Sequence, residues 1–210
     1  MKKVVLILLI PIIACSQSGQ FEESFERGLN NIFWKNQLGV LDSTFVTDSL
    51  TFDGAYSLKI IHRLDTSKGS HKRNEIVVGS KEKLLLQEED QWFKFAVFIP
   101  NDWIFEDNTG LGEFVSQWHH EEAFRYGGLS PLAIIIDRDH WKVRSVHGDP
   151  VSNGLFEKNK VDIDENILIR DVPVEKGVWT VWVIHAFWSA SGDALLDGWI
   201  HGEPVIEMGG

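Results

Sequence analysis

The sequence predicts an all-β fold, a jelly-roll β-sandwich of two antiparallel sheets with a concave groove. Short segments that alternate apolar and polar residues recur along the chain, and turn residues such as Asp53-Gly54 separate them. We find no stretch with the 3.6-residue periodicity of an amphipathic helix, no internal repeat and no low-complexity tract. The chain is also long enough for one large domain with a substantial core.

The N-terminal residues have the pattern of an export signal. Lys2 and Lys3 precede an apolar run, residues 4–13, which is too short to cross a bilayer as a helix. The sequence Ile12-Ile13-Ala14-Cys15 resembles the lipobox of bacterial lipoproteins, in which the cysteine is lipidated and becomes the mature N-terminus. Cys15 is the only cysteine, so no disulfide is expected.

These features divide the chain into three parts. We expect residues 1–15 to be a signal peptide outside the fold, residues 16–20 a polar tether, and residues 21–210 one folded domain. The expected location is that of an exported bacterial lipoprotein, at the outer membrane, in the periplasm or on the cell surface. Contact with a membrane is expected only through the lipid anchor, and the domain is expected to be a monomer.

The charge balance limits the possible partners. The formal net charge is −11, and it becomes −13 once Lys2 and Lys3 are removed. Such an acidic chain is not expected to bind nucleic acid. A polyanionic ligand would depend on local cations, which makes plain polyuronates better candidates than heavily sulfated glycans. The candidate cations are Lys72, Arg73, Arg125, Arg138 and Arg144.

The strands can be assigned in chain order from their alternation. Residues 91–99 give the clearest pattern, because every second residue from Phe93 to Ile99 is apolar. Residues 179–188 are apolar on both faces, as a central strand would be. His201-Gly202 predicts a hairpin turn, and the polar residues 153–166 predict an irregular segment. Strands are predicted at 38–47, 57–63, 73–79, 91–99, 113–119, 132–136, 141–146, 179–188, 195–200 and 203–207.

Two predicted strands carry polar side chains suited to chemistry. On a strand, residues i and i+2 share a face, so Gln117 and His119 point one way and Trp118 the other. The same parity places Arg73 and Glu75 together. If Trp118 lies in the core, the other side chains face a groove. An amide, an imidazole, a guanidinium and a carboxylate there would suit a substrate that carries carboxylates.

The order of four segments resembles a polysaccharide lyase family. These segments are Arg73-x-Glu75, WFKFAVFIP (92–100), Gln117-Trp118-His119 and WTVWVIHAFW (179–188). The family includes heparin lyase I and the glucuronan lyases, and it is distantly similar to the jelly-roll alginate lyases. The resemblance runs from about residue 22 to the end of the chain. It implies a concanavalin-like sandwich that cleaves uronic-acid polysaccharides by β-elimination.

The resemblance also implies roles for individual residues. Gln117 and Arg73 would neutralise the substrate carboxylate, Glu75 would hold Arg73, and His119 would be the base. An unperturbed histidine has a pKa near ~6.5, so its neutral form is available at neutral pH. Further substrate contacts are expected from His71, Lys72, Arg125 and Tyr126.

One departure from the family pattern concerns the C-terminus. The related lyases carry a strand resembling Tyr-x-Lys-x-Gly-x-Tyr, whose tyrosine supplies a proton. The tyrosines of this chain, Tyr56 and Tyr126, lie in no such motif. We therefore expect that the last strands are missing, and a non-catalytic glycan-binding jelly-roll lipoprotein stays open as the alternative.

Two other readings have weaker support. His119-His120-Glu121-Glu122 does not have the spacing of H-E-x-x-H, so we expect no catalytic metal and no cofactor, apart from a possible structural calcium ion. The acidic residues of the segment 162–165 could suggest a two-carboxylate glycoside hydrolase. The E-x-D-x-x-E order is absent there, and the segment is polar on both faces.

Overall fold

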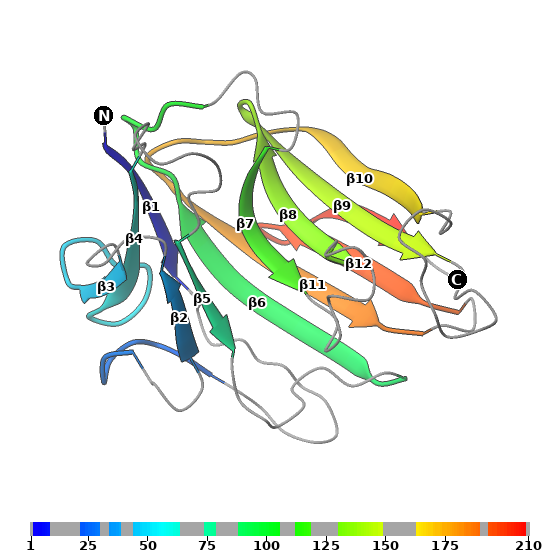
Figure 1. The fold of residues 1–210 in the computed structure, drawn as a ribbon, viewed down its shortest axis with the longest axis horizontal. Helices are drawn as coiled ribbons and strands as arrows, with labels where there is room; N and C mark the ends of the chain where they lie inside the picture. The colour runs from blue at the N-terminus through cyan, green and yellow to red at the C-terminus, as the bar shows by residue number, and fades with distance from the viewer. Residues whose placement is uncertain are drawn as a thin grey trace. The chain divides into compact units, whose positions relative to one another are not determined.

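The computed structural model contains only β-structure in the residues that it describes (Figure 1). It has thirteen strands there, β1 to β13, and all the ladders between them are antiparallel. No helix of the described part is long and apolar enough to cross a membrane. The described residues are 2–8, 22–29, 34–38, 44–63, 74–78, 88–105, 112–118, 130–148, 163–189 and 193–208.

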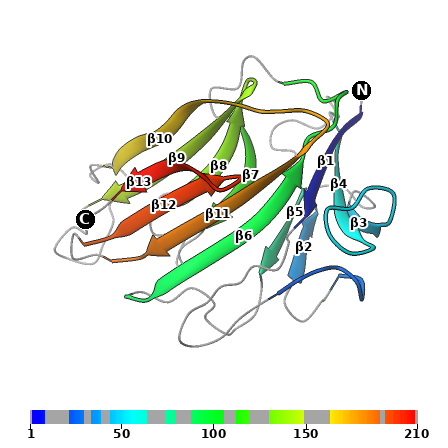
Figure 2. The same cartoon turned by 180° about the vertical axis from the view of Figure 1, so that it is seen from behind.

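The chain divides into two compact units. One unit combines residues 1–104 with residues 175–210, and the other consists of residues 105–174. The larger unit contains a seven-stranded sheet in the order β13-β12-β11-β6-β1-β4-β3 (Figure 2). Its strands are β1 (Lys2–Leu8), β3 (Thr44–Thr47), β4 (Ser57–Arg63), β6 (Asp90–Phe98), β11 (Trp179–Phe187), β12 (Leu195–Ile200) and β13 (Glu203–Met208).

Strands β6 and β11 form the centre of this sheet and confirm the two clearest strand predictions. They pair along their whole length, from Asp90 opposite Phe187 to Phe98 opposite Trp179. Alternate residues of both strands are buried, among them Phe93 and Trp182. The two strands therefore contribute one face to the core and leave the other face accessible.

Strand β1 departs from the expectation that residues 1–15 lie outside the fold. Lys2–Leu8 pairs with β4, where Val4 lies opposite Ile61, and with β6, where Leu6 lies opposite Phe98. The edges of β4 and β6 that face β1 have N–H and C=O groups that need hydrogen-bond partners. The apolar segment of β1 can provide them, because residues such as Val and Ile have a high β-propensity. Removal of the segment during export stays a prediction.

A two-stranded ladder belongs to the same unit. It joins β2 (Trp34–Leu38) to β5 (Asn74–Val78), with Gln37 opposite Glu75. The single strand expected at 38–47 is therefore wrong. Its two ends belong to β2 and β3, which lie in different sheets.

The smaller unit contains a four-stranded sheet in the order β10-β9-β8-β7. Its strands are β7 (Glu113–Trp118), β8 (Leu132–Asp137), β9 (His140–Gly148) and β10 (Ile163–Pro173). A tight turn joins β8 to β9, and Arg138 adopts a positive φ of 60° there.

Strand β10 is not predicted by the sequence pattern. The segment 153–166 was expected to be irregular, yet β10 begins at Ile163 and continues to Pro173. Its register with β9 shifts twice, between Ile167 and Ile169 and between Ile169 and Val172. These irregularities interrupt the two-residue alternation by which a strand is recognised in a sequence.

Candidate functional site

The exposed and buried sides of β7 follow the predicted parity. Trp118 is buried, with 7% of its surface exposed, whereas the preceding Gln117 is only half-buried. The hydroxyl of Ser130 donates to Gln117 Oε1 over 3.4 Å, which directs the donor end of the amide away from Ser130. Trp118 is thus part of the core, and Gln117 points to the other face of the sheet.

Gln117 shares its face with an arginine two strands away. Gln117 lies opposite Ala133 on β8, and Ala133 lies opposite Arg144 on β9. Residues directly opposite each other in a sheet point to the same face. Since neighbouring strands are about 5 Å apart, the Cα atoms of Gln117 and Arg144 are about 10 Å apart. Only the methyl group of Ala133 stands between the two side chains in this row.

Arg144 is a buried cation. Only 5% of its surface is exposed, and its guanidinium lies 5.2 Å from the ring centroid of Phe114. Nε of Arg144 is buried and has no hydrogen-bond partner among the residues that the structure describes. Burying a charged donor without a partner is costly, and an anion that reached it would therefore be bound strongly.

A second cation lies on the same face. Lys142 is two residues from Arg144 on β9, and its register partner on β8 is Ile135. Its ammonium group lies 3.8 Å from Asp137 Oδ2, and it is less exposed than that carboxylate. The pair is long and partly solvated, so its contribution to stability is small. Lys142 therefore adds positive charge beside Arg144 while remaining held to a carboxylate.

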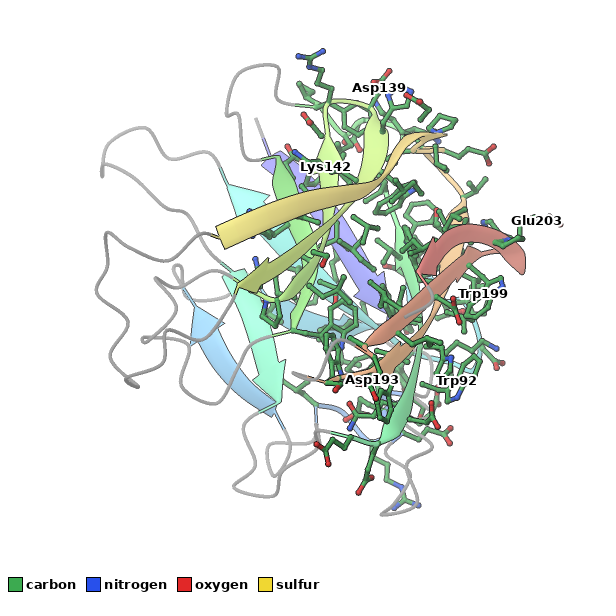
Figure 3. The ribbon with its side chains drawn as sticks, turned by 90° about the vertical axis from the view of Figure 1, so that its right-hand side faces the viewer. Trp92, Asp139, Lys142, Asp193, Trp199 and Glu203 are labelled. Atoms are coloured by element: carbon green, nitrogen blue, oxygen red, sulfur yellow. The ribbon has the colours of Figure 1, made fainter. Side chains whose placement is uncertain are left out.

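The β8–β9 turn carries a polar pair of its own. His140 Nδ1 and Asp139 Oδ1 are 2.7 Å apart. The hydrogen bond to His140, together with a backbone hydrogen bond and the nearby charge of Arg138, lowers the pKa of the Asp139 carboxyl below its usual value. The carbonyl of Asp139 also accepts a hydrogen bond from the N–H of Val174, the residue that follows β10. Figure 3 labels Asp139 and Lys142.

Most of the predicted site residues lie outside the described part of the chain. This applies to His119, Arg73, His71, Lys72, Arg125, Tyr126 and the lipobox residue Cys15. Glu75 lies on β5, where the structure describes its backbone pairing with Gln37. The expected grouping of Arg73 and Glu75 with Gln117 and His119 therefore stays a prediction.

From the sequence, Arg144 is only one of several local cations. The sequence nevertheless indicates that Arg144 points away from the core, because Trp141-Lys142-Val143-Arg144 alternates apolar and cationic residues. Trp141 and Val143 are buried, as this alternation requires. What the sequence could not provide was the register that aligns Arg144 with Gln117.

Comparison with known proteins assigns the family. Residues 22–210 match the polysaccharide lyase family, which is nearly all of the chain. The chain belongs to this family. No curated protein sequence matches it significantly.

A solved structure agrees with this assignment. The crystal structure of an endo-β-1,4-glucuronan lyase from the fungus Trichoderma reesei matches with a TM-score of 0.70, at 16% sequence identity. The match covers 87% of this chain and 73% of the fungal chain. At so low an identity the likeness establishes the fold alone, and it confirms the predicted all-β jelly roll of a polysaccharide lyase.

Proposed function

We propose that this polysaccharide lyase cleaves a uronic-acid polymer by β-elimination. The observation that carries the proposal is the row formed by Gln117, Ala133 and Arg144. It provides an amide and a buried guanidinium on one sheet face, and both are donors that suit a carboxylate. Family membership supports the reaction class, and this row supports an acidic sugar as the substrate.

The reaction itself explains why such donors are needed. A base removes the proton from carbon 5 of the uronate, and that electron pair forms the double bond between carbons 4 and 5. The bond from carbon 4 to the glycosidic oxygen breaks, and a proton donor protonates the departing oxygen. Charge develops on the carboxylate next to carbon 5, so donors placed against it lower the barrier.

Arg144 suits this task because of its burial. A guanidinium that is already desolvated and positioned over Phe114 needs little reorganisation when charge develops nearby. Its electrostatic effect is also larger than that of a solvated arginine, because the surrounding dielectric is lower. In this proposal Arg144 and Gln117 bind the carboxylate together, and Arg73, held by Glu75, is a third donor.

The remaining roles follow the resemblance to the family. His119 is the proposed base. His71, Lys72, Arg125 and Tyr126 are proposed to contact neighbouring sugar units. Lipidation of Cys15 would hold the protein at a membrane surface, and a Cys15→Ala variant should then be released in soluble form from cells that express the full chain.

The test is an assay of the full chain on defined polymers. Glucuronan, polymannuronate and polyguluronate are incubated with the protein, and unsaturated ends are followed by ultraviolet absorbance. We expect absorbance to rise with at least one polyuronate and not with a neutral β-1,4-glucan. Binding of a polyuronate without any cleavage would support the glycan-binding alternative. If no polyuronate is either cleaved or bound, the proposal is wrong.

A further inference from the structure

A β-bulge sets the direction of Phe114 on β7. Phe114 lies opposite Ile135 on β8. The next register pair joins Ser116 to Ile134, so Val115 is an extra residue between the two pairs. A bulge of this kind shifts the alternation of side chains along its strand. On a regular strand Phe114 would share a face with Ser116, and the bulge turns it to the other face.

The bulge brings Phe114 to the face that carries Gln117. Ile135, opposite Phe114, is two residues from Ala133, which lies opposite Gln117. Residues two apart on a strand share a face, and directly opposed residues do so as well. Phe114 and Gln117 are three residues apart and would otherwise point in opposite directions. On the bulged strand both lie on the face that carries Arg144.

The contact between Arg144 and Phe114 passes over a whole strand. Cζ of Arg144 lies over the Phe114 ring, 5.2 Å from its centroid. Strand β8 lies between β7 and β9, whose backbones are therefore about 10 Å apart. The arginine side chain must extend across β8 to reach the ring. On this face of β8, Ala133 and Ile135 are completely buried, as an arginine and a ring lying over the strand would require.

We propose that Phe114 is a positioning residue that holds the guanidinium of Arg144 over β8 for the substrate carboxylate. This inference rests on the proposed function, in which Arg144 binds that carboxylate. The face of an aromatic ring attracts a cation, and the attraction is stronger where water is excluded. Arg144 is almost completely buried, so the ring can fix its orientation before the substrate arrives.

A ring holds a cation without using its hydrogen-bond donors. Lys142, the other cation of this face, lies 3.8 Å from Asp137 Oδ2, and a carboxylate both neutralises a cation and occupies its N–H groups. The Phe114 ring does neither. Nε of Arg144 indeed has no hydrogen-bond partner among the residues that the structure describes. Arg144 therefore keeps its charge and its donors for an anionic ligand.

The alternative is that Phe114 is an ordinary exposed side chain. It is 39% exposed, and single exposed apolar residues are common on protein surfaces. Other exposed rings contact their own register partners: Trp92 stacks on His185, and Phe45 lies 5.7 Å from Lys59 Nζ. Strand pairing alone explains those contacts. It does not explain the contact of Phe114, because β7 and β9 are not paired and the ring reaches this face only through the bulge.

The first experiment is steady-state kinetics of the full chain on the polyuronate that it cleaves best. Phe114→Leu removes the ring and keeps an apolar side chain, and it should lower kcat about tenfold with little change in KM. Phe114→Tyr keeps the ring face and should stay within about twofold. Phe45→Leu is the matched control, because it removes a similarly exposed ring from a cation on the seven-stranded sheet. It should leave kcat unchanged.

A double-mutant cycle tests whether Phe114 acts through Arg144. In Arg144→Met the ring has no cation to hold, so adding Phe114→Leu should change kcat by less than about twofold. If Phe114 only stabilised the fold near the site, Phe114→Leu would cause the same loss in both backgrounds.

A spectroscopic experiment separates this inference from the proposed function, because it needs no catalysis. A guanidinium held over a ring should give an Nε–H resonance that is shifted upfield and exchanges slowly with water. Its absence from Arg144→Met assigns the signal. Phe114→Leu should move the signal toward the ordinary arginine position and speed its exchange, whereas Phe114→Tyr should change neither.

The outcomes distinguish the two proposals. If the full chain cleaves no polyuronate, the proposed function fails, and the Nε–H signal alone decides whether Phe114 holds Arg144. If cleavage occurs, the inference is wrong when Phe114→Leu is fully active, when its loss persists in Arg144→Met, or when Phe45→Leu loses as much. If Phe114→Leu does not fold, the unmodified protein provides the test. An Arg144 Nε–H signal with the position and exchange rate of a solvated arginine would then overturn the inference.

Discussion

The Gln117–Arg144 row and the stacked rings of Trp92, His185 and Trp199 invert the usual distribution of residues in opposite ways. On the four-stranded sheet a guanidinium is almost completely buried, with Nε lacking a partner among the described residues. On the seven-stranded sheet an indole is 38% exposed beside another tryptophan. Folding alone favours neither placement, because charges prefer water and aromatic rings prefer the core. Such local conflicts tend to mark functional sites.

The comparison also separates two kinds of surface. The row on the four-stranded sheet offers donors and positive charge, which suit an acidic group. The stacked rings lie beside the carboxylates of Asp90 and Asp197 instead. The following predictions test whether the two regions differ in this way.

The largest effect is expected at the proposed base. His119→Ala should reduce polyuronate cleavage by roughly 10²–10⁴-fold, because the proton on carbon 5 loses its acceptor. His120→Ala is the matched control, since the neighbouring side chain on a strand points to the other face. Initial rates of unsaturated-end formation measure both. Equal losses of activity in the two variants would mean that His119 is not the base.

A large effect on stability separates the buried tryptophans from the exposed ones. Trp182 is completely buried on β11, and Trp182→Ala should destabilise the fold by about 3–5 kcal/mol. Trp92→Ala, on the accessible face, should cost about 1 kcal/mol or less. Urea unfolding of the three proteins gives the comparison. A loss at Trp92 as large as that at Trp182 would mean that the stacked rings stabilise the fold as strongly as a buried tryptophan does.

Arg144 should affect activity and stability in opposite directions. Replacing it by methionine keeps the volume but removes a buried charge, so Arg144→Met should leave the fold equally stable or stabilise it by about 1 kcal/mol. The same change should reduce cleavage by about 10²–10³-fold, as expected when one donor to a developing charge is lost. Arg144→Lys should recover part of the rate. A strongly destabilised Arg144→Met variant would instead indicate a structural cation.

The smallest effect concerns the β8–β9 turn. Because the pKa of Asp139 is lowered in the folded state, its contribution to stability is present above the unfolded pKa of about 3.9 and is lost as the pH falls through the folded value. Asp139→Asn should therefore be slightly less stable than the unmodified protein at pH 6, and the difference should vanish in strong acid. Chemical unfolding at a series of pH values measures this. A difference that persists at low pH would mean that the hydrogen bond does not depend on the charge.

The strands that the sequence predicted are those with uninterrupted alternation. Residues 91–99 and 179–188 could be recognised because each pattern is local and complete. Strand β10 could not, because its pairing with β9 shifts twice and its first residues are polar. The sequence of β1 predicts an export signal, because an export signal and a buried strand are both rich in the same apolar residues.

The candidate site also has some features that neighbouring residues predict and others that depend on distant strands. The burial of Trp118 and the opposite direction of Gln117 could be predicted from two-residue parity. The alignment of Gln117 with Arg144 depends on the register of three strands, and register is a property of the assembled sheet. The stacked rings of Trp92, His185 and Trp199 likewise bring β6 together with the consecutive strands β11 and β12, which lie far from β6 in the sequence.

If residues 1–15 are an export signal, as the sequence predicts, export and the pairing of β1 compete in time. The residues of β1 are synthesised well before their partners Ala96 to Phe98, which lie about ninety positions later in the sequence. Pairing over such a sequence distance is slow. During that interval the N-terminal segment is still accessible to an export receptor or a peptidase, and once it lies between β4 and β6 its backbone is covered on both sides. If the segment were cleaved before it paired with β4 and β6, a cell would accumulate the sheet without β1. Slowing translation before residue 98 should favour this cleaved form.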